Sequence, residues 1–579
     1  MKHQPLRPLA PRLVLALLAI PCLGPAPAVP ALLRNDQKAF GQKGAVVSGN
    51  PLASRVGLAI LKRGGNAVDA AVATFLTLAV VHPQAGNLGG GGFAIVRMAD
   101  GRKLALDFRE MAPGRAHAKM YQDEKGEVIP GKSLRTALAV GVPGSPAGMY
   151  HLWKKFGKIK KWSMLVYPAL AFADKGFEVD GFLARSIRIK EKALRRWPAT
   201  REIFFPHGTR LKKGDFLVQK DLAATLKRLA DGGPEGFYAG KTAELFVAEM
   251  KRTEGWITQK DLESYAVKER KVLEGSYRGH PVLSMPPPSS GGIALLQMLH
   301  ILETWPLKDY GAGSAQELHY EIEAMRRAYA DRARWLGDPD FFRVPVAGLI
   351  ARDYTAKLAE GIAADRASKG VEAGLPAGAP PEESRETTHF SVLDAEGNAV
   401  SCTTTLNSTF GNGQIVGGAG FFLNNEMDDF SSKPGVPNQF GLVGAKANEI
   451  AAGKRPLSSM TPTIVLDKAG KEPWLILGSP GGGRIINTVL QVIVQVVDHG
   501  LPLDLAVRAP RIHQQWLPPA TYWEPLAIPP DARRKLEGMG HLFQKRPSVI
   551  GRCQAIQRDA KGRILAVSDP RSGGAASAW

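Results

Sequence analysis

The stretch that decides the fold is Glu386-Thr387-Thr388-His389-Phe390-Ser391, which joins a low-complexity tail to an apolar strand. Residues 371–386 before it are rich in Gly, Pro, Ala and Glu and have no apolar periodicity, which indicates an exposed, flexible segment. Residues 388–393 and 399–405 after it, separated by a turn at 396–398, predict a β-hairpin that ends in Thr403-Thr404-Thr405-Leu406-Asn407. Thr387 therefore stands where cleavage would turn an internal threonine into a free N-terminus.

Composition alone favours a plain threonine-rich edge strand here, but two features point to chemistry. A free α-amine has a pKa near neutrality, so an N-terminal threonine carries its own base for the hydroxyl proton. The glycine-rich turn 478–483 precedes an apolar helix expected at 484–497, and its backbone N–H groups suit an oxyanion. The same glycines also suit a tight strand-to-helix turn, and both interpretations can hold.

Further out, the pattern predicts alternating helices and strands in both halves of the chain. Residues 46–83 read as helical with a break at Gly64-Gly65 and a restart at Asn66, a residue that suits an N-cap. Two strands, 93–98 and 103–108, flank an Asp-Gly turn, and residues 145–364 are mostly helical. A second hairpin is expected from 462–466 and 474–477. These elements predict a layered α/β architecture.

Length and composition describe a globular chain of 579 residues, with 44% hydrophobic and 22% charged residues. The net charge of +21 raises the question of a nucleic-acid partner, but the basic residues are scattered in short runs rather than gathered on one stretch. We therefore expect a solvated basic surface and no nucleic-acid partner.

The first 28 residues have the pattern of an export signal. Basic residues at 2, 7 and 12 precede the apolar run 13–20 and the cleavage-site triplet Ala26-Pro27-Ala28. The run is too short to span a bilayer, and Cys22 lacks a convincing lipidation context because Pro21 precedes it. We expect a secreted protein of the bacterial periplasm, with residues 1–28 removed and no membrane span in the mature form.

Three other patterns do not predict a nucleotide-binding loop, a metal site or a disulfide scaffold. Residues 126–133 match the G-x-x-x-x-G-K-S phosphate loop, but the residues before them are polar rather than a buried strand, and Pro130 removes a backbone N–H. The twelve histidines show no metal-ligand spacing, so we expect neither a metal nor a cofactor. With Cys22 removed, Cys402 and Cys553 remain, which excludes a disulfide scaffold. One bridge between them stays open, although their apolar contexts favour buried free thiols.

The sequence closely resembles the γ-glutamyltranspeptidase (glutathione hydrolase) family across almost the whole mature chain. The matching stretches are 64–71, 82–93, 107–113, 285–292, 329–332, 387–389, 423–430, 454–460, 478–482 and 568–571. The resemblance implies a four-layered αββα N-terminal-nucleophile hydrolase fold, built from a large subunit (29–386) and a small catalytic subunit (387–579) of one precursor. The cleavage site would lie between Glu386 and Thr387.

Site roles follow from the same resemblance, position by position. Thr387 would be the nucleophile and Thr405 its hydrogen-bond partner, while Gly481 and Gly482 would form the oxyanion hole. Arg109 would bind the substrate α-carboxylate with help from Ser458 and Ser459. The α-amino group would be held by Asn407, Glu426 and Asp429. Phe440 stands in the loop 434–441, which matches the lid of lidded members, at a position where many bacterial relatives have tyrosine.

The chemistry of the substrate agrees with this assignment independently of the family. A γ-glutamyl group ends in a zwitterion, which needs a cation for its carboxylate and acidic acceptors for its ammonium. The expected activity is cleavage of γ-glutamyl amides such as glutathione, with transfer to water, amino acids or dipeptides. Two alternatives remain open: a related acylase of the same fold, acting on cephalosporin-type or poly-γ-glutamate substrates, and a non-processed exported binding protein.

Overall fold

The computed structural model describes residues 35–371 and 387–579. The expected signal segment 1–28, residues 372–386 of the expected tail and the cleavage-site residue Glu386 lie outside the described residues. Within the described part, no helix is both long enough and apolar enough to cross a bilayer.

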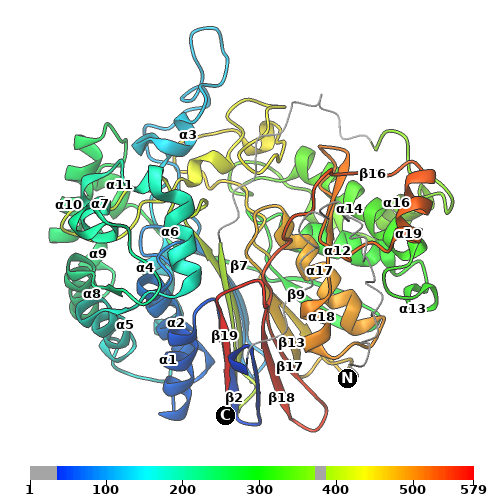
Figure 1. Ribbon diagram of the computed structural model, residues 1–579, viewed down its shortest axis with the longest axis horizontal. Coiled ribbons are helices and arrows are strands. Elements are labelled where there is room, and N and C mark those ends of the chain that lie inside the picture. Colours follow the sequence, from blue (N-terminus) through cyan, green and yellow to red (C-terminus); the bar gives the residue numbers. More distant parts are fainter. Residues whose placement is uncertain (1–34, 372–386) are drawn as a thin grey trace, which may run out of the picture.

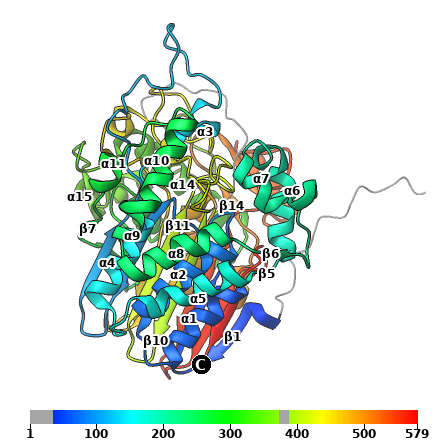
Figure 2. The same ribbon diagram turned by 90° about the vertical axis from the view of Figure 1, so that its left-hand side faces the viewer.

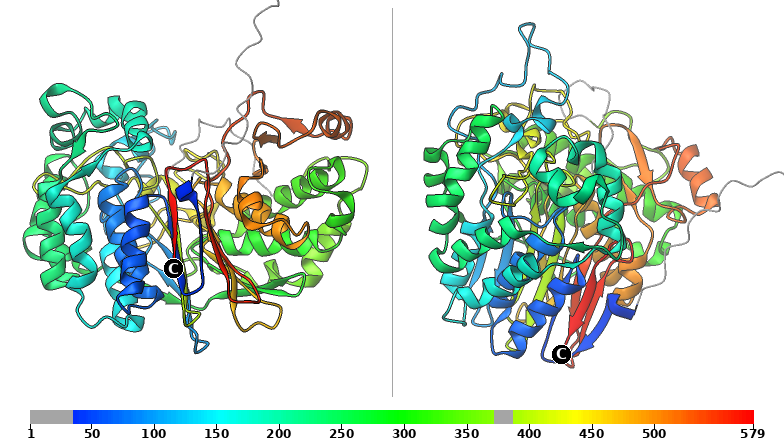
Figure 3. Two further views of the ribbon diagram at one scale, coloured as in Figure 1. Left: turned by 60° about the horizontal axis from the view of Figure 1, so that its bottom comes forward. Right: turned by 60° about the vertical axis from the view of Figure 1, so that its left-hand side comes forward.

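Two antiparallel seven-stranded sheets form the centre of the molecule (Figures 1 and 3). The first, here called the Thr387 sheet, runs in the order β19 (Ala575–Ala578), β2 (Gly44–Ser48), β10 (Thr388–Asp394), β11 (Ala399–Thr405), β3 (Gly91–Arg97), β4 (Lys103–Asp107) and β7 (Lys268–Arg270). The second, the Gly482 sheet, runs in the order β1 (Lys38–Gly41), β18 (Ile564–Ser568), β17 (Gln554–Arg558), β13 (Pro473–Gly478), β12 (Thr463–Leu466), β9 (His280–Ser284) and β8 (Leu273–Tyr277). Their facing surfaces bury an apolar layer that includes Val47, Phe93, Ile95, Ile464 and Ile476.

Helices cover the outer face of each sheet, which gives four layers (Figure 3). Against the Thr387 sheet lie α1 (Pro51–Lys62), α2 (Ala67–Val81) and α4 (Ser145–Phe156). Farther from the sheet pack α5 (Ser163–Lys175) and α8 (Lys220–Gly232), which face the viewer in Figure 2. Against the Gly482 sheet lie α12 (Gly291–Leu302) and α17 (Arg484–Val497), joined by α14 (Ala315–Trp335), α16 (Arg352–Glu360) and α18 (Leu503–Arg508). This is the expected αββα arrangement.

The remaining elements are shorter or lie outside these layers. The helices are α3 (Lys132–Arg135), α6 (Gly181–Leu194), α7 (Pro198–Phe204), α9 (Glu235–Tyr238), α10 (Gly240–Arg252), α11 (Gln259–Glu263), α13 (Leu307–Tyr310), α15 (Val346–Leu349) and α19 (Pro530–Gly538). The strands are β5 (Phe177–Glu178), β6 (Phe216–Leu217), β14 (Ile512–His513), β15 (Ala520–Trp523) and β16 (Leu542–Phe543).

Local sequence signals account for the helices beside the site. Asn66 caps α2 and forms a capping box with Asp69, and every residue of α2 is buried because the helix is packed on several sides. Helix α17 spans Arg484–Val497, as the apolar pattern predicts.

Two expectations about secondary structure are wrong in part. Residues 46–48 were expected to be helical but belong to strand β2, which pairs with both β10 and β19 and is buried throughout. A strand buried on both faces loses the alternation that distinguishes it from a buried helix. Strands β7, β8 and β9 likewise interrupt the largely helical region 145–364.

The hairpin of β10 and β11 lies inside the Thr387 sheet rather than at its edge. Strand β10 pairs with β2 on one side and β11 on the other, while β11 continues to β3. The register places Thr388 opposite Thr404. Thr387, directly before β10, therefore meets the end of β11 at Thr405.

Candidate active site

Thr387 lies at the end of a central strand and is buried, with 6% of its surface exposed. Its Oγ1 is 3.2 Å from Oγ1 of Thr405, whose oxygen also accepts a 2.8 Å hydrogen bond from the backbone N–H of Asn407. Because Asn407 supplies one donor to the Thr405 oxygen, the Thr405 hydroxyl can donate its own hydrogen to Thr387. The Thr387 hydroxyl is thereby held in one place beside the pocket.

The glycine turn between β13 and α17 faces the same pocket. Gly481 and Gly482 have φ angles of +138° and +55°, conformations that favour glycine. Neither backbone N–H donates a hydrogen bond to an acceptor in residues 35–371 or 387–579. Gly482 lines the pocket together with Thr387, and Gly481 precedes it. Two backbone donors therefore stand ready at the start of a helix, where a developing negative charge is favoured.

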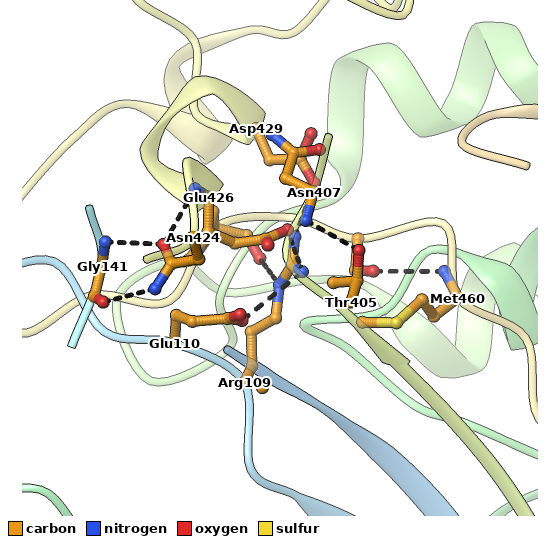
Figure 4. Close-up of polar contacts among 12 residues, drawn as sticks. Arg109, Glu110, Gly141, Thr405, Asn407, Asn424, Glu426, Asp429 and Met460 are labelled. Carbon is orange, nitrogen blue, oxygen red and sulfur yellow. Dashed lines mark hydrogen bonds and ion pairs between the residues drawn. The ribbon is translucent and has the colours of Figure 1, made fainter. Parts of the chain in front are cut away.

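Arg109 is the centre of a buried charge cluster (Figure 4). It follows β4, and its Nη1 donates to Glu426 Oε1 through a short contact, while its Nη2 donates to Asp429 Oδ2 at 2.6 Å. The backbone carbonyls of Pro456 and Leu457 accept from Nε and Nη2 at 3.2 and 3.3 Å. Glu110 Oε2 lies 3.7 Å from Nη1.

The cluster holds more acid than base. Three carboxyl groups, those of Glu110, Glu426 and Asp429, surround the single guanidinium of Arg109. Both Glu110 oxygens and Glu426 Oε2 are buried and accept no N–H or O–H bond from another residue type in the described chain, and the Glu110 and Glu426 carboxyl groups lie close enough to share a proton. Burial raises the pKa of all three acids, and the guanidinium only partly offsets that rise. This end of the pocket therefore favours an incoming cation.

A second group of residues, which follows the carbonyls bound by Arg109, also lines the pocket. Ser458, Ser459 and Met460 lie in the loop before β12, and the Ser458 hydroxyl oxygen accepts a 3.1 Å hydrogen bond from the Met460 N–H. The guanidinium of Arg332 in α14 reaches the Ser459 hydroxyl at 3.2 Å. The pocket thus has hydroxyl and cationic groups as well as acids.

The loop 434–441 contributes Phe440 to the pocket wall. The Phe440 ring packs on Gly482, so closely that a Cβ added there would lie 2.6 Å from the ring atom Cδ1. Asn438 Nδ2 donates to Asp429 Oδ1 at 3.1 Å, and the Gln439 N–H donates to Asp428 Oδ2 at 3.0 Å. The acidic turn 426–429 therefore anchors the loop beside the pocket.

The structure brings nearly all of the sequence-predicted site residues into one pocket. Its wall includes Arg109, Thr387, Thr405, Asn407, Glu426, Asp429, Phe440, Ser458, Ser459 and Gly482, with Gly481 adjacent. Sequence reasoning missed Arg332, Leu442, Met460 and Ile485 in the wall and Glu110 behind it. Arg332 and Glu110 belong to the family-like stretches 329–332 and 107–113, but those stretches do not say which member faces the pocket.

Two smaller expectations concern other side chains. Cys402 and Cys553 are both buried and free, and burial raises the pKa of each thiol. Val128, inside the stretch 126–133, forms an isolated antiparallel bridge with Gln122, and no parallel strand precedes the stretch in the described residues, so the context of a phosphate loop is missing. No cluster of three or more metal-ligating side chains occurs in residues 35–371 and 387–579.

Comparison with known proteins identifies relatives along the whole chain. The sequence pattern of the family described as gamma-glutamyltranspeptidase matches residues 53–579. The chain is 46% identical to the glutathione hydrolase proenzyme of Escherichia coli K12, over 96% of this chain and 97% of that protein. It is 37% identical to the acylase ACY 1 proenzyme of a Pseudomonas strain, over 95% of this chain and 96% of that protein.

Solved structures of similar proteins also align with this chain. A cephalosporin acylase from Bacillus halodurans aligns with a TM-score of 0.81 at 27% identity, over 96% of this chain and 99% of that one. A Helicobacter pylori gamma-glutamyltranspeptidase chain aligns with a TM-score of 0.54 at 45% identity, over 55% of this chain and 91% of that one. The pocket geometry, the αββα layers and the match over residues 53–579 lead to one conclusion: the chain belongs to the gamma-glutamyltranspeptidase family.

Proposed function

We propose that this protein is an autoprocessed γ-glutamyltransferase and glutathione hydrolase. Its precursor is cut between Glu386 and Thr387 into a large subunit of residues 29–386 and a small subunit of residues 387–579. The observation that carries the proposal is the 3.2 Å contact between the Thr387 and Thr405 hydroxyls, in one pocket with the Arg109 charge cluster. The names of several relatives, which call them proenzymes, support processing.

The mechanism is acyl transfer through a threonine ester. The free α-amine of Thr387 takes the proton of its own hydroxyl, and Oγ1 attacks the γ-carbonyl carbon of the substrate. The carbonyl oxygen becomes an oxyanion, which the N–H groups of Gly481 and Gly482 stabilise. As the C–N bond breaks, the leaving amine takes the proton held by the α-amine, and a γ-glutamyl ester remains on Thr387.

Water, an amino acid or a dipeptide then attacks this ester and releases either glutamate or a new γ-glutamyl amide. In the precursor, the same hydroxyl attacks the carbonyl of Glu386, and hydrolysis of the resulting ester exposes the α-amine of Thr387. One hydroxyl therefore serves both maturation and turnover, and no cofactor is needed for either step.

The charge cluster supports a substrate with a free α-amino-acid end. The surplus of carboxyl groups over Arg109 leaves Glu426 and Asp429, with Asn407, able to receive the substrate ammonium. Arg109, Ser458 and Ser459 receive the α-carboxylate. A glutaryl group, as removed by some acylases of this fold, has no ammonium to offset the carboxyl groups that exceed the single charge of Arg109. The acid surplus therefore favours γ-glutamyl substrates such as glutathione over glutaryl ones.

The N-terminal pattern of basic residues, apolar run and cleavage triplet supports export to the bacterial periplasm. Glutathione and other γ-glutamyl compounds would then be met outside the cytoplasm, as would amino acid and dipeptide acceptors. N-terminal sequencing of protein recovered from the periplasm would locate the removal site.

The decisive experiment combines processing with activity. Wild-type protein should run as two chains on a denaturing gel, with the smaller one beginning at Thr387, and should release the amine from a γ-glutamyl anilide. Thr387→Ala should run as a single inactive chain, whereas Thr388→Val, a buried neighbour outside the chemistry, should still be cut. Efficient cleavage of Thr387→Ala would remove Thr387 from the mechanism, and a preference for glutaryl anilide would favour the acylase alternative.

A further inference from the structure

Arg332 is a buried cation in the pocket wall that the proposed mechanism does not use. It lies in α14, in the helical layer outside the Gly482 sheet, and only 5% of its surface is exposed. It lines the same pocket as Thr387 and Arg109. Helix α14 also contacts the glycine turn, because the Tyr329 hydroxyl donates to the carbonyl of Gly483.

The two arginines of the pocket are neutralised to different degrees. Arg109 has carboxyl partners at both Nη atoms, and although burial opposes its charge, these acids raise its pKa above the ordinary value. Arg332 forms no ion pair with a carboxyl group anywhere in the described chain, and burial lowers its pKa, although Tyr329 and the more distant Asp429 partly offset that effect. A buried cation without a counter-ion is unfavourable until an anion arrives.

The hydrogen bonds of Arg332 direct a hydroxyl group toward the pocket. Its Nε donates to Ser290 Oγ at 3.0 Å and its Nη2 to Ser459 Oγ at 3.2 Å. Ser290 uses its own hydrogen in a 2.7 Å bond to the carbonyl of Ser458. The Ser459 hydroxyl donates to no acceptor in the described residues. Because its oxygen already accepts from Arg332, its hydrogen is left for a ligand.

From this geometry we infer that Arg332 is a positioning and specificity-determining residue for the substrate α-carboxylate. Its unpaired charge attracts the carboxylate, and its bond to Ser459 orients the hydroxyl that donates to that carboxylate. Arg109 by itself supplies little net charge for this purpose, since Glu426 and Asp429 already offset it. The inference rests on the proposed γ-glutamyl specificity. It gives Arg332 a part in recognising the α-carboxylate of the zwitterion.

Two anilide substrates that differ only at the α-carboxyl group test this role. Arg332→Met should raise KM for γ-glutamyl anilide by about 10- to 100-fold, the effect expected for losing hydrogen bonding to a charged group. The KM for the α-amide of the same anilide, which has no carboxylate, should rise several-fold at most, because losing a neutral hydrogen bond has a smaller effect than losing one to a charged group. Arg332→Lys, which keeps the charge, should recover part of the loss for γ-glutamyl anilide only.

A matched control variant and a double-mutant cycle separate a specific role of Arg332 from a general effect on folding. Arg327→Lys alters another buried arginine of α14, which pairs with Glu323 away from the pocket, and should change neither substrate's kinetics selectively. If Arg332→Met does not mature, a double-mutant cycle of Arg332→Lys and Ser459→Ala, measured as KM for γ-glutamyl anilide, still tests the inference. Non-additive effects on KM support the inference that Arg332 acts through Ser459, and additive effects overturn it. Equal losses on both anilides would also overturn it, whereas wild-type inactivity on γ-glutamyl anilide would instead refute the proposed function.

Discussion

Replacing Gly482 by alanine would place a methyl group against the aromatic ring that covers the pocket. The added Cβ would lie 2.6 Å from Cδ1 and 2.9 Å from Cε1 of Phe440. The normal separation of nonbonded carbon atoms is 3.5–4.0 Å, so the ring or the turn must move by about 1 Å. The Phe440 backbone is held by its N–H bond to Asn438 and by a bond from Gln515 to its carbonyl, which resists that movement.

The effect on activity should exceed the effect on folding. The left-handed φ of +55° costs a non-glycine residue about 1–2 kcal/mol of stability. A shift of the turn would also move the Gly482 N–H away from the proposed oxyanion position, and losing one such donor lowers kcat by about 10²- to 10³-fold. We therefore expect a protein that still folds but has a strongly reduced kcat.

The assay is steady-state release of anilide by matured protein, together with urea unfolding. Gly500→Ala is the matched control, because Gly500 has a similar φ of +64° after the other end of α17 and no neighbour within 4 Å of an added Cβ. It should lose stability but keep its kcat. The double variant Gly482→Ala with Phe440→Ala removes the overlapping ring atoms and should recover activity several-fold over the single variant. A near-normal kcat for Gly482→Ala, or no recovery in the double variant, would refute the steric reasoning.

Three further variants probe the remaining parts of the site. Arg109→Ala should lower kcat/KM for γ-glutamyl anilide by a factor equivalent to about 2–5 kcal/mol, because the buried acids lose their cation. Adding Glu426→Gln should restore part of the stability against urea that Arg109→Ala loses. Unchanged kinetics of Arg109→Ala would contradict the substrate assignment. Phe440→Tyr adds a hydroxyl whose hydrogen bond can stabilise the closed form of the proposed lid by about 0.5–1.5 kcal/mol. Transfer to glycylglycine should then rise relative to glutamate release, and an unchanged ratio would exclude such a hydrogen bond. Burial raises the pKa of Asp428 from 3.8, the ordinary value that applies to the unfolded chain, to about 7 in the folded protein. The contribution of Asp428 to the free energy of unfolding is therefore full below pH 3.8 and is lost as pH rises through about 7. Asp428→Asn should flatten this decline, which is about 4 kcal/mol at most, in urea unfolding between pH 4 and 8, and an equally steep decline would disprove the role of Asp428.

Much of the local structure could be predicted because it depends on short-range signals. The cap at Asn66, the alternation and turn in 388–405 and the apolar run 484–497 each act within a few residues, and the structure has these elements at nearly the expected bounds. Strand β2 was missed because its neighbours β10 and β19 come from distant parts of the chain. Its burial on both faces erases the pattern that a strand with one exposed face would show.

By itself, the sequence determined which chemical groups the site contains: a threonine at a tail-to-strand junction, a glycine turn before a helix, and an arginine with acidic residues. Only the tertiary structure decided how their charges balance. It places the carboxyl groups of Glu110, Glu426 and Asp429 around the guanidinium of Arg109, whereas Arg332 forms no ion pair with a carboxyl group in the described chain. The physical reason is that the energy of a buried charge depends on which groups surround it after folding, and those groups come from segments far apart in the sequence.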